Sequence, residues 1–245
     1  MWKNKKISVI FPTFNEKHSI KAVIEDFQNS DYIDEIIIVN NNASLGTKEE
    51  VEKTSAKQVF ESKQGYGYAL RRGMDVATGD LIILSEPDGT FIGSDIIKLL
   101  VFSDEYDAVW GCRTDVRLIG AGANMAMHMR LGNYFVAKLL QLLFNTTRLS
   151  DVGCTFKLFN REVIEKIKPD FAIGGSHFGP ELMTLTAIHG FEVIEIPVNY
   201  LKRVGISSVT GSLKKTFVLA IVMVLLILKQ FIKYKILKWP TKQSY

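Results

Sequence analysis

The sequence predicts an α/β fold with a mostly parallel central sheet flanked by helices. Short apolar runs, typical of strands buried on both faces, alternate with longer segments whose apolar residues recur at helical spacing. Parallel strands need crossover connections, and the intervening helices supply them. Polar and glycine-rich turns follow the runs. We therefore expect a ligand site at the carboxyl ends of the strands, where open α/β sheets bind their ligands.

The elements can be assigned in chain order. A first strand at residues 7–11 precedes a helix in which Ile20, Val23, Ile24 and Phe27 share one face. Further strands are expected at residues 36–39, 58–60, 81–84, 108–110 and 191–198. Further helices are expected at residues 68–76, 131–144 and 181–189, the last ending before Gly190. The first hundred residues therefore have the pattern of a nucleotide-binding α/β half.

Length and composition favour one catalytic domain with a short appendage. The chain has 245 residues, of which 47% are hydrophobic and 23% charged, with a net charge of +4. We expect the domain at residues 1–212 and an apolar, basic helix at residues 213–245. Cys112 and Cys154 have no CxxC spacing, so neither a zinc site nor a disulfide framework is indicated. The apolar stretch at residues 7–11 is too short for a signal-peptide core, so a cytoplasmic location is expected.

The last fifth of the chain interleaves lysines with apolar residues. This pattern suits an anionic membrane surface better than nucleic acid, which is not expected as a partner. Residues 216–228 are apolar after the first residue, whereas a bilayer span takes about 20 apolar residues. An interfacial helix, a short single span and a core helix all stay open. The helix at residues 131–144 is also apolar around most of its circumference, which fits either buried core or a second membrane contact.

Two carboxylates, Glu86 and Asp88, follow the strand at residues 81–84. A separation of two positions places both side chains on the same side of an extended chain. Such a pair can share a hard divalent cation, Mg²⁺ or Mn²⁺, which can also hold phosphate oxygens. The alternative is an ordinary acidic turn.

The order of motifs resembles the inverting family-two glycosyltransferases of GT-A fold, and within them the polyprenyl-phosphate glycosyltransferases similar to dolichol-phosphate mannose synthase. The resemblance runs from about residue 7 to residue 208. Its blocks are Pro12, Thr13, Phe14, Asn15 and Glu16; residues 39–47; Gly65, Gly67, Ala69, Leu70, Arg71 and Gly73; Glu86, Pro87 and Asp88; residues 151–156; and Tyr200, Arg203, Gly205 and Ser207.

The resemblance implies roles for residues in these blocks. The donor nucleotide would be held by Pro12, Phe14, Glu16, Val39, Asn41, Gly67 and Pro87, and the metal by Glu86, Asp88 and Thr90. Two departures matter. Asn40 and Asn41 replace the usual aspartates, so a base preference cannot be carried over, because an amide donates as well as accepts. Glu86 replaces an aspartate and is one methylene longer, which keeps oxygen ligation but alters the geometry.

The resemblance further implies transfer of a sugar from a nucleotide-diphosphate donor to a polyprenyl phosphate at a membrane, by a protein attached peripherally or by one span. A lipid phosphate is already anionic and needs no strong base, and arginines suit it because their planar fork binds two oxygens. The residues expected at the reacting groups are Asp88, Arg113, Arg117 and Arg203, with Arg130 in a similar segment.

Two alternatives stay open. A saccharide hydroxyl acceptor would need a base, for which Glu181 is the candidate, although a carboxylate after Pro180 also suits the first turn of a helix. A nucleotide-binding protein without catalysis is the other alternative, suggested by the same departures at Asn40, Asn41 and Glu86.

Overall fold

The computed structural model describes residues 1–123, 125–205 and 213–241. Seven strands form one sheet in the order β3-β2-β1-β4-β6-β5-β7. The strands are β1 Ile7–Thr13, β2 Glu35–Asn40, β3 Lys57–Phe60, β4 Leu81–Leu84, β5 Ala108–Cys112, β6 Lys157–Asn160 and β7 Val193–Pro197. Strands β1 to β4 pair in parallel, as do β5 and β7, while β6 runs antiparallel to β4 and β5. The predicted mostly parallel sheet is confirmed.

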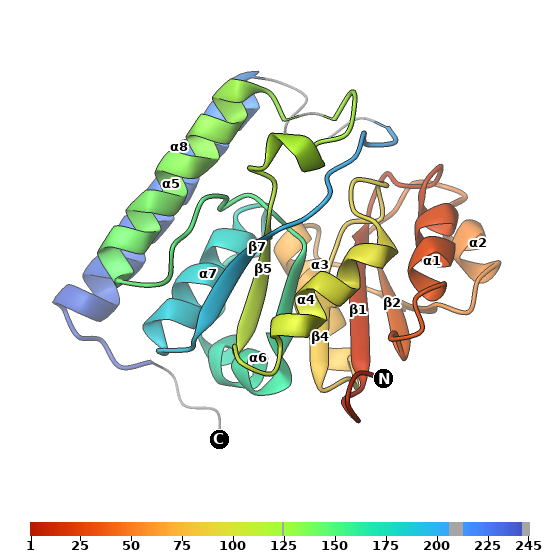
Figure 1. Cartoon of the computed structure of the whole chain (residues 1–245), viewed down its shortest axis with the longest axis horizontal. Helices are drawn as coiled ribbons and strands as arrows, with labels where there is room; N and C mark the ends of the chain where they lie inside the picture. The colour runs from red at the N-terminus through yellow and green to blue at the C-terminus, as the bar shows by residue number, and fades with distance from the viewer. Residues whose placement is uncertain (124, 206–212, 242–245) are drawn as a thin grey trace.

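Helices cover both faces of the sheet (Figure 1). They are α1 Ile20–Gln28, α2 Thr47–Glu52, α3 Tyr66–Val76, α4 Ile96–Phe102, α5 Met127–Phe144, α6 Arg161–Ile167, α7 Phe178–Ile188 and α8 Leu213–Phe231. Because side chains alternate along a strand, Ile82 and Leu84 of β4 face a core shared with α3, α6 and α7. Leu81 and Ile83 face the second core, which α1 and α4 complete.

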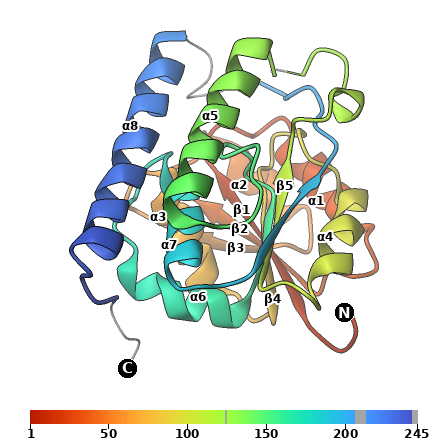
Figure 2. The same ribbon diagram turned by 60° about the vertical axis from the view of Figure 1, so that its left-hand side comes forward.

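Helices α5 and α8 lie side by side along one flank of the domain, outside α7 (Figure 2). They run in the same direction, since their first turns line a common pocket and their last turns meet through Phe144 and Phe231, with ring centroids 5.9 Å apart. Met223 and Ile227 of α8 are buried in the same core as β4. The division of the chain at residue 212 stays a prediction, and in this structure α8 packs as part of the domain.

Several boundaries differ from those expected. Helix α5 begins at Met127 and α7 at Phe178, each at least three residues earlier than predicted, because polar and glycine positions continue the helix there. Strand β6 was not predicted. Its sequence, Lys157–Asn160, has only two apolar residues, Leu158 and Phe159, between a buried lysine and an asparagine.

Candidate active site

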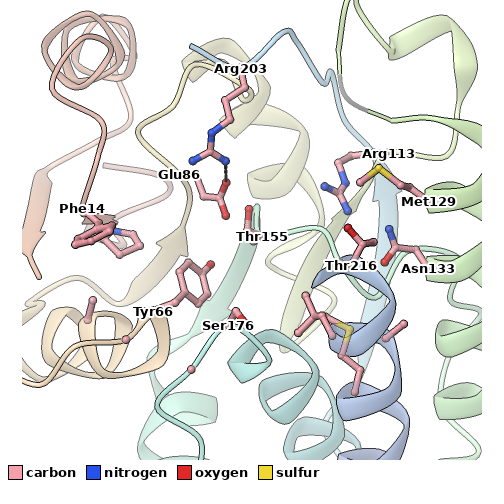
Figure 3. A pocket seen from close by; sticks show the side chains of 18 of the residues that line it. Phe14, Tyr66, Glu86, Arg113, Met129, Asn133, Thr155, Ser176, Arg203 and Thr216 are labelled. Carbon is pink, nitrogen blue, oxygen red and sulfur yellow. Dashed lines mark ion pairs between the residues drawn. The ribbon is translucent and has the colours of Figure 1, made fainter. Parts of the chain in front are cut away.

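A pocket of about 740 Å³ opens at the carboxyl edge of the sheet. One end is lined by residues that follow β1, β2 and β4, and the other by the first turns of α5 and α8. Figure 3 shows Phe14 and Tyr66 on one side of Glu86 and Arg203, and Arg113, Asn133 and Thr216 on the other. The pocket therefore joins the expected nucleotide end to a chamber between two apolar helices.

A single guanidinium, that of Arg203, faces three carboxylates at the centre of the site. Its Nη1 lies 2.7 Å from Asp88 Oδ2 and 3.6 Å from Glu86 Oε2, and its Nη2 lies 3.3 Å from Glu16 Oε1. Burial, together with the neighbouring Asp88 carboxylate, raises the pKa of Glu86 to about 8. The raised pKa reflects burial and the crowding of carboxylates around one guanidinium, and a divalent cation bound beside Glu86 would favour its ionised form.

This cluster fits a divalent cation. Asp88 is fully buried, and its Oδ1 accepts from the backbone N–H of Thr90 at 2.9 Å and from its hydroxyl at 2.6 Å. Asp88 Oδ2 is buried and faces the guanidinium of Arg203 at 2.7 Å, so a cation bound there would share this oxygen with Arg203 or replace it. The described residues contain no cluster of three or more His, Cys, Asp or Glu that could hold a metal. A cation bound by Glu86 and Asp88 would thus take its other oxygens from water or phosphate.

Glu16 organises the turn after β1. Its Oε2 accepts from the backbone N–H of Phe14 at 2.7 Å and of Asn15 at 2.8 Å, while its Oε1 meets Arg203. Pro12 and Phe14 line the pocket, and Phe14 is 41% exposed. Pro87 lines it as well, and its carbonyl oxygen accepts from the Ser19 hydroxyl at 2.7 Å. The expected donor-side residues of this turn therefore lie together.

Asn41 lines the pocket, but its side chain is fully engaged within the protein. Its amide nitrogen donates to the carbonyl oxygens of Glu61 and Lys63 at 2.9 and 2.8 Å. Its Oδ1 accepts from Gly65 N at 2.8 Å and Gln64 Nε2 at 3.1 Å. These bonds use both donors and both acceptor positions of an amide. Asn41 thus shapes the loop at residues 61–65, and its contact with a base stays a prediction.

Arg113 lines the pocket on the side of Glu86 opposite Phe14 and is fixed by Asp151 (Figure 3). Its Nε and Nη2 bind the two carboxylate oxygens of Asp151 at 2.8 and 2.9 Å, and its backbone N–H adds a third bond at 2.9 Å. Glu195 in turn accepts from the backbone N–H of Asp151 at 2.9 Å. The ion pair between Arg113 and Asp151 lowers the pKa of the Asp151 carboxyl despite its burial and raises the pKa of the Arg113 guanidinium.

Four predicted residues lie elsewhere. The Arg117 side chain is 88% exposed and paired with Asp115, and it is not among the described residues that line the pocket. Val39 faces the core, and the hydroxyl of Thr90 orients Asp88. Gly67 is a packing position, because a Cβ there would lie 2.7 Å from the carbonyl oxygen of Ile173. The roles assigned to these residues stay predictions, and Ser207 lies outside the described residues.

Glu181 does not line the pocket. It is fully buried, and its two carboxylate oxygens each accept a backbone N–H, from Ala172 and Ile173, at 3.0 Å. The pocket is also lined by Thr155, from the block at residues 151–156, and by three residues that were not singled out from sequence, Ser176, Asn133 and Thr216. The Gly-Gly-Ser run at residues 174–176 was the available signal, since glycines allow close approach to a ligand.

Comparison with known proteins agrees with this geometry. The family model "Glycosyl transferase family 2" matches residues 8–168. A Haloferax volcanii dolichyl-phosphate hexose transferase is 27% identical over 202 residues, which cover 81% of this chain and 84% of that protein. The H. volcanii low-salt glycan biosynthesis hexosyltransferase Agl6 is 27% identical over 208 residues, and this chain spans about half of its length, 48%.

The fold has solved counterparts. Glucosyl-3-phosphoglycerate synthase from Mycobacterium tuberculosis, solved with Mn²⁺, UDP and phosphoglyceric acid, superposes with a TM-score of 0.70 at 17% identity. The match covers 93% of this chain and 79% of that one. At this identity the likeness concerns the fold.

Proposed function

The chain belongs to glycosyl transferase family 2 and has a GT-A-like fold, and from that premise we propose that it transfers a hexose from a nucleotide-diphosphate donor to a polyprenyl phosphate, with inversion. The observation that carries the proposal is the continuous pocket, which runs from Glu86, beside the buried Asp88, into a chamber walled by α5 and α8. Apolar residues dominate that chamber: Met129, Val136, Phe217, Leu219, Ala220 and Met223. Such a wall suits a prenyl chain next to a polar reaction centre.

The donor half would hold the diphosphate against the carboxylate cluster. A bound Mg²⁺ or Mn²⁺ would neutralise the charge that develops on the leaving diphosphate. Arg203 stands beside the same carboxylates and can hold a phosphate oxygen through its planar fork. UDP and Mn²⁺ in the solved M. tuberculosis synthase support a nucleotide donor and a divalent metal here.

The acceptor half favours an anionic nucleophile. The carboxylates among the described residues that line the pocket are Glu16 and Glu86, and both are paired with Arg203. A hydroxyl acceptor would need a free base there, whereas a phosphate oxygen is already ionised. Arg113, oriented by Asp151, offers a fixed positive group on the acceptor side. The H. volcanii dolichyl-phosphate hexose transferase supports the same acceptor class.

We place this reaction at the cytoplasmic face of a membrane. Cys112 and Cys154 are free and buried, which suits a reducing compartment. By length and composition, the apolar helix Lys214–Ile236, with a mean hydropathy of 2.1, could cross a bilayer.

The decisive experiment offers the purified protein a panel of nucleotide sugars with Mg²⁺ or Mn²⁺ and a short polyprenyl phosphate, and measures lipid-linked sugar. Asp88→Asn is expected to abolish product, while Asp75→Asn, an exposed aspartate on α3, serves as the matched control. Release of nucleoside diphosphate with transfer only to a saccharide would replace the lipid acceptor by a hydroxyl acceptor. Binding of nucleotide without turnover of any donor would favour the non-catalytic alternative.

A further inference from the structure

Glu195, at the centre of the edge strand β7, is a partly buried carboxylate that does not line the pocket. Its cross-strand neighbour on β5 is Trp110, and the neighbour of Trp110 on β6 is Lys157. Residues paired in this way point to the same face of a sheet, so Glu195 faces the core that α5 and α7 cover. A carboxylate in such a place needs partners, because an unpaired buried charge is costly.

Three hydrogen bonds join Glu195 to the turn at residues 150–153. Its Oε2 accepts from the backbone N–H of Ser150 at 2.7 Å and from the Ser150 hydroxyl at 2.5 Å. Its Oε1 accepts from the backbone N–H of Asp151 at 2.9 Å. Burial raises the pKa of Glu195, while these bonds and the charge of Lys157 oppose the rise. Glu195 therefore ties the turn to the edge strand through both of its carboxylate oxygens.

The same turn holds Arg113. The Asp151 carboxylate accepts from two side-chain nitrogens of Arg113 and from its backbone N–H, and also from the backbone N–H of Gly153 at 3.1 Å. Gly153 packs directly on the guanidinium, because a Cβ there would lie 3.0 Å from Arg113 Nη2. The Tyr200 ring covers the face of the guanidinium, with its centroid 5.0 Å from Arg113 Cζ. The turn therefore fixes one edge of the guanidinium, and Tyr200 fixes its face.

This arrangement determines which part of Arg113 can meet an anion in the pocket. Asp151 binds Nε and Nη2, which lie on one edge of the planar guanidinium, so Nη1 lies on the other edge. The side chain lines the pocket beside Asn133 (Figure 3). A shift of the turn would move the guanidinium with it, and a misplacement of about 1 Å at such a group can cost on the order of a hundredfold in rate.

We propose that Glu195 is a positioning residue: by holding the turn at residues 150–153, it fixes the Arg113 guanidinium in the pocket and so raises the affinity for an anionic acceptor. The identity of the acceptor rests on the proposed function, whereas the hold on Arg113 does not. Because Glu195 does not line the pocket, its effect passes through the backbone of Ser150 and Asp151 and then through the Asp151 carboxylate.

The kinetic test compares Glu195→Gln with Glu192→Gln in the full chain. Glutamine keeps the size of the side chain but turns an NH₂ donor toward one of the donors of the turn. With a short polyprenyl phosphate as acceptor, Glu195→Gln should raise the acceptor KM about tenfold or more and leave the donor KM unchanged. Glu192, which is exposed just before β7, is the matched control and should change neither value. A merely structural role would lower kcat with the folded fraction and leave both KM values unchanged.

A second measurement needs no substrate. The Nε–H signal of Arg113 in NMR spectra, identified by its absence from Arg113→Lys, reports the bond to Asp151. Glu195→Gln should speed the exchange of this proton with water about tenfold or more, whereas Glu192→Gln should not. Ser150→Ala removes only the hydroxyl bond to Glu195 and keeps the test decisive where Glu195→Gln does not fold. It should raise the acceptor KM about threefold.

The two measurements separate this inference from the proposed function. Faster exchange of the Arg113 proton together with a raised acceptor KM supports the proposal. Unchanged exchange in Glu195→Gln would overturn it, and so would faster exchange with an unchanged acceptor KM or an equal rise in the donor KM. Wild-type protein that transfers no sugar to polyprenyl phosphate would refute the proposed function. The exchange of the Arg113 proton then decides by itself whether Glu195 positions Arg113.

Discussion

Replacing Glu181 by glutamine tests whether its carboxylate has a structural role or acts as a catalytic base. The two oxygens of Glu181 accept the backbone N–H groups of Ala172 and Ile173, and Arg71 Nη2 lies 3.6 Å from Oε2. Glutamine keeps one acceptor and turns its NH₂ toward the other donor. The loop it holds supplies Gly175 and Ser176 to the pocket. The change should therefore loosen the loop rather than remove a proton acceptor from the reaction.

The magnitude follows from the buried groups left without partners. A hydrogen bond to a charged group contributes about 1.5–3 kcal/mol, and a buried unsatisfied donor costs about 1–3 kcal/mol. Burial raises the pKa of the Glu181 carboxyl, and the Arg71 side chain that faces it is 23% exposed, so the two do not form a fully buried ion pair. Glu181→Gln is therefore expected to lower the free energy of unfolding by about 1–3 kcal/mol, the cost of one buried backbone donor left without its acceptor. For a chain of this size that corresponds to a fall in Tm of about 2–12 °C.

The assay combines thermal unfolding with transfer measured well below the lower Tm. Glu162→Gln, an exposed glutamate in the first turn of α6, is the matched control and should leave Tm unchanged. Glu181→Gln should retain transfer per folded molecule. A variant with wild-type Tm and no transfer would refute this reasoning and make Glu181 the base for a hydroxyl acceptor.

Three further predictions concern buried polar groups. Asp151→Ala leaves Arg113 without its buried partner and should cost about 3–5 kcal/mol in denaturant unfolding; an unchanged midpoint would contradict the assignment. Asn41→Asp turns a carboxylate toward the carbonyl oxygens of Glu61 and Lys63, so it should lower the free energy of unfolding by about 1–3 kcal/mol. It should also weaken nucleotide binding measured by calorimetry, and equal affinity would overturn this expectation. Burial lowers the pKa of Lys157 from 10.5, so the unfolded chain binds more protons and wild-type stability should rise with pH up to about 10.5. Lys157→Met should lack this rise in unfolding measured across alkaline pH, and an identical pH profile would count against it.

Much of the sheet was predictable because its strands are apolar on both faces. The strands at residues 7–11, 36–39 and 81–84 are fully buried in the structure, and continuous apolar runs report that directly. Strand β6 was missed because its burial comes from position rather than composition. Lys157 is 1% exposed, with its Nζ 5.3 Å from the Trp110 ring centroid, and no local pattern predicts a lysine in that place.

The residues of the site also divide into those that the sequence could place and those that it could not. Glu86 and Asp88 could be placed together because two positions on one extended segment share a side. Arg203 lies 115 residues after Asp88, and its position beside these carboxylates could only be inferred from the resemblance. The segment at residues 200–204 is held there by tertiary hydrogen bonds, from Leu201 N to Thr90 O and from Val204 N to Asp88 O, each at 2.8 Å. Arg117 shows the converse, because a local bond to Asp115 holds it in solvent.

The packing of α8 has a practical consequence for work on this protein. Apolar tails are commonly removed to obtain an enzyme that stays in solution. Here Thr216, Leu219 and Met223 form one wall of the pocket, and Ile227 fills the core beneath it. Cutting the chain before α8 would open the acceptor chamber to water and expose α5 and α7 at once. Solubility is better sought by changing single outward residues of the helix, so that the wall is kept intact.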